Sequence, residues 1–124
     1  MTAQHVYEKA LGLLDELEED GTVSDDTDAV YAKRAIQLID TLQRELARYE
    51  GVEPNSITAL TQTLKISDVT AATVLPYGLA ANFALVDNMT ALYGVYNSQY
   101  NNGVIRIATS FNDYEDDMHV MSGF

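Results

Sequence analysis

Apolar residues recur at steps of three and four over residues 24–51, and this spacing constrains the fold more than any other feature of the chain. Such steps place side chains on one face of an α-helix. The residues that follow the spacing are Tyr31, Ala35, Leu38, Ile39, Leu42, Leu46 and Tyr49. Ser24, Asp25 or Asp26 supplies the cap, and Gly51 followed by Pro54 supplies the stop. We therefore expect a long amphipathic helix over this segment.

The N-terminal segment, residues 4–19, has the same helical period. Its apolar face consists of Val6, Ala10, Leu13, Leu14 and Leu17. Thr2 stands where an N-cap is expected, and Gly21 breaks the helix. Two helices joined by a short loop pack antiparallel, so the sequence predicts an N-terminal helical hairpin.

Two further helices are expected in the C-terminal half. Residues 69–87 are apolar on nearly all sides, which is typical of a buried helix, and Pro76 either lies in a first helical turn or kinks the helix. The last helix runs from residue 89 to residue 101 or beyond, with Asn88 or Thr90 as its cap. The run Asn101-Asn102-Gly103 either ends this helix or weakens it.

The predicted fold class is all-α, a small helical bundle built from the N-terminal hairpin and two further helices. Residues 57–66 leave room for one short strand pair, because Leu64-Lys65-Ile66 alternates between apolar and polar. A length of 124 residues suits one domain. We expect a single helical domain over residues 1–110 and an acidic, flexible C-terminal tail over residues 111–124.

Nineteen acidic residues against seven basic ones give the chain a formal net charge of -12. A surface this negative repels phosphate backbones and anionic lipids, so we expect neither direct nucleic-acid binding nor membrane contact. Nine acids lie within residues 8–28, whereas residues 29–50 hold four bases against three acids. This asymmetry suits head-to-tail contact between copies of the chain, although it would equally aid solubility.

The chain contains no cysteine, which excludes disulfides, zinc–thiolate sites, iron–sulfur clusters and thiol catalysis. We count no apolar run near the ~20 residues that span a bilayer. Residues 1–8 lack the basic start and apolar stretch of a signal peptide. Nucleotide-binding, nucleophile-elbow and zinc-protease motifs do not occur. We therefore expect an intracellular protein that is not an enzyme and takes no cofactor, metal or small-molecule substrate.

Two sets of side chains resemble weak metal sites. Aligning Gly21 with the glycine of a calcium loop places Glu16, Glu18 and Asp20 at ligand positions, but Thr27 stands where a bidentate glutamate is needed. An ordinary acidic turn is the better interpretation. The second set consists of His119, Asp113, Asp116 and Asp117. It lies in the expected flexible tail, where a metal would be held weakly.

Tyr93, Tyr96 and Tyr100 form one stripe of the last helix, together with Gly103 and Ile107. A tyrosine joins a large apolar ring to a polar tip, so the stripe suits either a core whose hydroxyls reach the rim or a protein interface. Both interpretations stay open. The residues of the candidate interface are Tyr93, Tyr96, Tyr100, Leu92 and Tyr77.

The order of segments over residues 7–100 resembles a known family. The telling residues are Leu64-Lys65-Ile66-Ser67-Asp68, Val74-Leu75-Pro76-Tyr77-Gly78-Leu79-Ala80-Ala81, Asp87-Asn88, and the aromatic run from Leu92-Tyr93 to Tyr96-Asn97-Ser98-Gln99-Tyr100. In this order the chain is similar to the small head–tail connector (adaptor) proteins of tailed bacteriophages and prophages.

This resemblance implies an α-helical structural protein of the virion, assembled in the cytoplasm of the bacterial host. It further implies a ring-type homo-oligomer that docks on a portal or tail-completion protein. The chain departs from the family in its acidity and in the acidic segment beyond Ile107, which leaves the docking face open. The residues alone also allow a small acidic regulator that mimics DNA on a basic partner, or a weak calcium-binding module.

Overall fold

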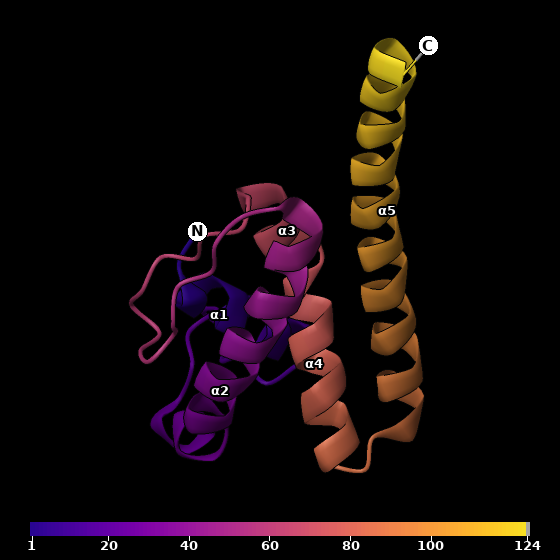
Figure 1. Cartoon of the computed structure of the whole chain (residues 1–124). Helices are drawn as coiled ribbons and strands as arrows, with labels where there is room; N and C mark the ends of the chain where they lie inside the picture. The colour runs from indigo at the N-terminus through magenta and orange to yellow at the C-terminus, as the bar shows by residue number, and fades with distance from the viewer. Residues whose placement is uncertain (124) are drawn as a thin grey trace.

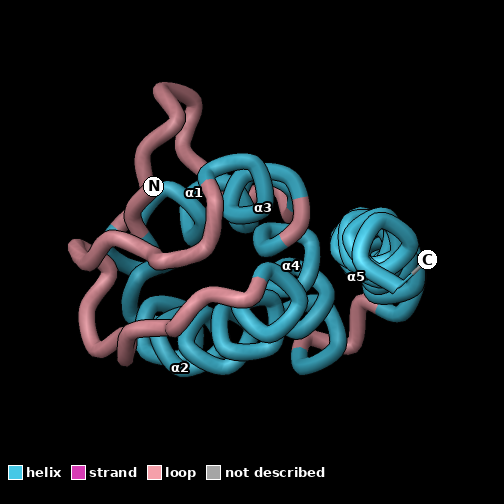
Figure 2. The backbone as a smooth tube through the Cα atoms, turned by 45° about the horizontal axis from the view of Figure 1, so that its top comes forward, coloured by secondary structure: helices cyan, strands magenta, loops and turns pink. Residues whose placement is uncertain are grey.

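A computed structural model describes the backbone of residues 1–123 and the side chains of residues 1–110. The helices are α1 (Ala3–Leu13), α2 (Asp25–Glu50), α3 (Asp68–Thr73), α4 (Leu75–Val86) and α5 (Thr90–Gly123). The short α3 leads into α4, and α4 packs against α1, α2 and α5 (Figures 1 and 2). The described residues contain no strand, so the all-α fold class is confirmed.

The core forms around α4 because this helix is apolar on nearly every side. Leu75, Leu79 and Phe83 of α4 are fully buried, as are Leu11 of α1 and Ile39 of α2. A helix surrounded by three others has no face that must remain polar. The prediction of a buried apolar helix in this segment is therefore confirmed for most of its length.

The capping residues of the first two helices agree with the sequence. The hydroxyl of Ser24 accepts a hydrogen bond from the Thr27 backbone N–H at 3.1 Å, and Thr2 accepts one from the His5 backbone N–H at 3.4 Å. Each bond satisfies one of the backbone donors that a helix leaves unpaired at its start. Gly51, in the left-handed conformation with φ 70°, ends α2 as predicted.

Two helices end on residues other than glycine in the left-handed region. α1 ends before Asp15 (φ 58°), and α4 ends before Asn88 (φ 60°). After α4, the Met89 N–H donates to the Ala84 carbonyl at 2.8 Å, which closes the helix with a backbone bond. Two expectations are thereby corrected. The first helix stops at Leu13 rather than residue 19, and Asn88 ends α4 instead of capping α5.

Pro76 lies in the first turn of a helix, which was one of its two predicted places. The Val74 backbone, at φ -119°, separates α3 from α4, and Pro76 follows in the first turn of α4. A proline fits this place because backbone donors of the first turn have no partner within the helix. The expected single helix over residues 69–87 is thus two helices joined at Val74.

Residues 52–67 form a loop rather than a strand pair; one isolated bridge joins Thr63 to Thr2. The side chain of Gln43 on α2 is fully buried and fastens this loop. Its amide donates to the Asn55 carbonyl at 2.9 Å and accepts from the Lys65 N–H at 2.7 Å. Side-chain bonds to α2 replace the ladder that a hairpin would have made.

α5 runs straight through Asn101-Asn102-Gly103, where the sequence predicted an end or a weak point. At Gly103 the helix touches Val74, and a Cβ added there would lie 2.8 Å from a Val74 methyl. Close packing thus explains the glycine. The backbone continues as helix to Gly123, while the side chains of residues 111–124 lie outside those described. The division into a 1–110 domain and a flexible tail stays a prediction.

Candidate protein interface

The tyrosine stripe of α5 lines the seam between α5, α4 and α1. Tyr100 is buried in the core at 5% exposure, whereas Tyr93 and Tyr96 are half-buried against it. The Tyr96 hydroxyl donates to the Leu13 carbonyl at the end of α1, and its ring lies 6.0 Å from that of Tyr77. Tyr96 thus contacts Tyr77 and the end of α1, whereas Tyr100 packs beside Gly78 of α4.

The five candidate interface residues therefore divide by exposure. Leu92 is exposed at 37%, Tyr77, Tyr93 and Tyr96 present only part of their surface, and Tyr100 presents almost none. An interface residue must offer surface to a partner, so Tyr100 serves the core instead. Burial, followed by the nearby charge of Glu45, raises the pKa of the Tyr100 hydroxyl.

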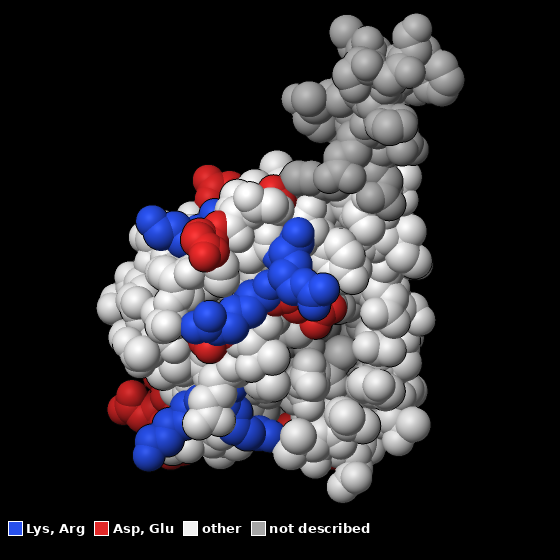
Figure 3. All heavy atoms as spheres, in the orientation of Figure 1, with Lys and Arg blue, Asp and Glu red and all other residues white. Residues whose placement is uncertain are grey.

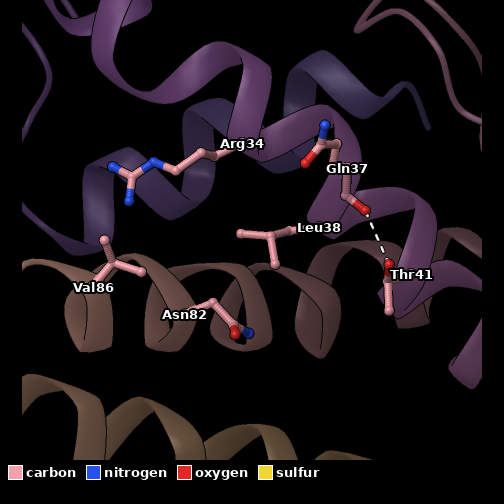
Figure 4. Close-up of a pocket in the computed structure, with 6 residues that line it drawn as sticks. All are labelled: Arg34, Gln37, Leu38, Thr41, Asn82 and Val86. Atoms are coloured by element: carbon pink, nitrogen blue, oxygen red, sulfur yellow. Dashed lines mark hydrogen bonds between the residues drawn. The ribbon is translucent and has the colours of Figure 1, made fainter.

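A second surface, which we call the α2–α4 groove, was not found from the sequence. It is a hollow of about 330 Å³ between the two helices (Figure 4). Its lining consists of Arg34, Gln37, Leu38, Thr41, Asn82 and Val86. Leu38 and Val86 supply the apolar part of the lining, and the other four residues supply polar groups. The combination suits a segment of protein better than a small polar metabolite.

One end of the groove is fixed by a polar cluster. The Tyr31 hydroxyl donates to the Asp87 carboxylate at 2.6 Å, and the Arg34 guanidinium lies 3.9 Å from the same carboxylate. Arg34 also lies over the Tyr31 and Phe83 rings, 5.1 and 5.5 Å from their centroids. Burial and the Asp87 hydrogen bond raise the pKa of Tyr31 to about 12. These contacts hold Arg34 in place beside the groove.

Four exposed apolar residues belong to three helices whose ends lie at the same end of the fold, and we call these residues the apolar end. Its members are Val30 of α2, Leu85 and Val86 of α4, and Leu92 of α5. Three of the four are more than half exposed, at 57%, 54% and 61% for Val30, Leu85 and Val86. These helix ends lie at the bottom of Figure 1. An apolar surface contributed by several elements is a feature of protein-binding sites.

The basic residues are concentrated on α2, although the whole chain is strongly acidic. Lys33, Arg34, Arg44 and Arg48 are four of the seven Lys and Arg residues. Figure 3 shows basic side chains running over the face on which α2 lies. Arg44 is engaged locally, because its guanidinium donates to Asp40 at 3.1 Å. α2 as a whole carries six acids against four bases, but two of the bases, Lys33 and Arg34, lie together on the stretch that borders the groove.

The acidic turn between α1 and α2 forms an open hollow lined by Glu18, Glu19, Asp20 and Thr22. Asp20 is occupied within the turn, since its carboxylate accepts from the Thr22 hydroxyl at 2.6 Å and from its backbone N–H at 3.0 Å. Those hydrogen bonds hold the pKa of Asp20 below its ordinary value. Among the described side chains, no three acids or histidines come together as a metal site, and the His119 set lies outside them.

Sequence reasoning missed the groove and the apolar end because both depend on which part of α4 its neighbours cover. The all-round apolar pattern gave the same signal for buried Leu79 and exposed Val86. The sequence offered one clue to the exposure of Leu85 and Val86, which is their position within the helix. Leu85 and Val86 fall in the last turn, next to the Asp87-Asn88 break, where a helix leaves the core.

The stretch Asp68–Val86 is long and apolar enough to cross a membrane, so the expectation that no run approached that length was wrong. Its mean hydropathy is 1.5, but 61% of it is buried within the protein, and the chain breaks there into α3 and α4. Buried core helices of soluble domains have this composition.

Comparison with known proteins found no family model that matches the chain, and no curated protein or solved structure matches it.

Proposed function

We propose that this chain is a structural assembly subunit that works by associating with copies of itself and with neighbouring proteins. The form we favour is the phage head–tail connector that its sequence resembles, a ring-type oligomer docked on a portal or tail-completion protein in the virion. In this role the chain carries out no reaction and takes no cofactor.

The observation that carries the proposal is the apolar end. Val30, Leu85, Val86 and Leu92 expose apolar surface from three different helices at one extremity of the fold. Covering apolar surface with protein contributes about 25 cal/mol per Å² removed from water. Contact between these apolar side chains and water is unfavourable, so burying them against a second subunit stabilises the assembly.

The charge pattern supports the same role. A chain with net charge -12 that carries four of its seven bases on one helix has local surfaces of opposite charge. Two copies placed with unlike surfaces together gain attraction, while two copies placed with like surfaces together repel. Such pairing favours a head-to-tail arrangement, which closes into a ring when the rotation between subunits allows it.

The test is the mass of the protein in solution, measured by size-exclusion chromatography with light scattering from micromolar to millimolar protein. We expect a ring or a concentration-dependent oligomer. The double variant Leu85→Gln with Val30→Thr should weaken association by about tenfold or more, because both changes replace apolar surface at the proposed contact. Val69→Thr is the matched control, since Val69 is 72% exposed on α3.

A strict monomer at every concentration, with no capture of a portal protein on co-expression, would contradict the proposal. A monomer that instead binds a basic nucleic-acid-binding protein would favour the acidic regulator.

A further inference from the structure

We propose that the α2–α4 groove binds the acidic C-terminal segment of a neighbouring copy, residues 111–124, which begins within its α5. The inference rests on the self-association proposed above, and it names the two surfaces that meet.

The groove offers both apolar and basic contact. Leu38 and Val86 form the apolar part of its lining, and Arg34, also in the lining, is held by Asp87 and by the Tyr31 ring. Lys33 is exposed one helical turn before Gln37, so its ammonium belongs to the same surface of α2. A partner segment that fits here carries apolar side chains together with negative charge.

Residues 111–124 have this composition. The segment contains four acids, Asp113, Glu115, Asp116 and Asp117, and no Lys or Arg. It also contains apolar and aromatic residues, namely Phe111, Tyr114, Met118, Val120, Met121 and Phe124. Charge of the opposite sign to Lys33 and Arg34 is thus combined with side chains that can cover the apolar lining of the groove.

The contact must form between copies. α5 is a single helix of 34 residues, about 51 Å long at 1.5 Å per residue, whereas its main partner α4 has 12 residues and spans about 18 Å. In Figure 1 the C-terminal part of α5 continues past the other helices and points away from α4. A straight helix cannot bring its own end back to the groove, so the end is available to a neighbour.

The acidic turn between α1 and α2 is the competing occupant. Its exposed side chains Glu18, Glu19 and Asp20 would also attract the bases of α2. These three residues are adjacent in sequence and all charged, so they offer nothing for the apolar lining formed by Leu38 and Val86. The C-terminal segment supplies both negative charge and apolar side chains, whereas the turn supplies negative charge alone.

Two full-length variants test the pairing by exchange of charge. The groove variant carries Lys33→Glu and Gln37→Glu, at exposed positions of α2. The tail variant carries Asp116→Lys and Asp117→Lys. The matched control carries Lys65→Glu and Gln99→Glu, which make the same change of charge at exposed positions outside the groove. Circular dichroism checks that each variant is folded, and light scattering measures its mass.

We expect the groove variant and the tail variant each to associate about tenfold or more weakly than the wild type, and the control to associate like the wild type. A mixture of the two weakened variants should regain the wild-type mass with equal amounts of each, because every groove then meets a tail of opposite charge. If only the groove variant weakens, another segment occupies the groove and the inference is wrong.

The remaining outcomes separate this inference from the proposed function. If the wild type associates and neither variant weakens it, the inference is wrong while self-association stands. If the wild type is monomeric at every concentration in low salt, the inference is wrong, and the proposed function is wrong as well when co-expression captures no portal protein.

Discussion

Two glycines of α5, Gly103 and Gly94, lie in different surroundings: the first is closely packed and the second is open. At Gly103 an added Cβ would lie 2.8 and 2.9 Å from the Val74 methyls, and Val74 is itself buried. At Gly94, also on α5, an added Cβ would meet nothing within 4 Å. Helix propensity favours alanine over glycine at both positions, so only the difference in packing makes the expected effects of the two substitutions differ.

We therefore predict that Gly103→Ala lowers the free energy of unfolding by about 1–3 kcal/mol, because α5 must move away from Val74 at the junction of α3 and α4. Gly94→Ala, the matched control, should raise it by up to ~1 kcal/mol. Urea denaturation followed by circular dichroism measures both. Equal effects of the two changes would mean that α5 does not pack on Val74 as described.

At the scale of elements, α2 could be predicted from the sequence because its signals are local. Ser24 and Gly51 satisfy the two ends of the helix within a few residues of chain. The path of α5 through Gly103 could not be predicted, because the contact with Val74 that favours it comes from a distant part of the chain. Tertiary packing there overrides a breaking signal.

The same distinction between local sequence signals and distant contacts applies to the candidate interface. The sequence identified the tyrosine stripe by its helical spacing, and the structure packs Tyr77, Tyr93 and Tyr96 against the core, with Tyr77 and Tyr96 in contact. It could not separate half-buried Tyr96 from buried Tyr100, since both lie on one face of α5. The groove depends on how α2 crosses α4, which no local pattern records.

The loop of residues 52–67 depends on α2 for its shape. Gln43 alone satisfies the Asn55 carbonyl and the Lys65 N–H, and it is fully buried. Gln43→Leu would leave both backbone groups without that partner, so we predict a loss of about 2–4 kcal/mol in the free energy of unfolding. The control Gln99→Leu, at an exposed position, should change it by less than about 0.5 kcal/mol.

Hydrogen exchange gives an independent measurement for the same element. In Gln43→Leu the Lys65 amide should lose its protection, while amides in the middle of α5 keep theirs. If the Lys65 amide stays protected, the bond to Gln43 does not hold the loop.

At the scale of the whole molecule, the net charge of -12 has two opposite consequences. Within one copy, like charges repel, and this repulsion lowers the stability of the fold. Between copies, the proposed contact joins Lys33 and Arg34 of α2 to an acidic segment, and this attraction favours association. Salt screens both interactions, because exposed charges interact little beyond a Debye length of about 8–10 Å at moderate ionic strength.

Added sodium chloride should therefore raise the thermal midpoint of the dilute monomer by a few degrees and, at higher protein concentration, lower the average mass of the oligomer. The midpoint must be measured where the protein is monomeric, because association itself stabilises the fold. Calorimetry gives the first quantity and light scattering the second. Association that strengthens with salt would indicate that burial of the apolar end dominates over the charge pairing, since screening leaves apolar contact intact.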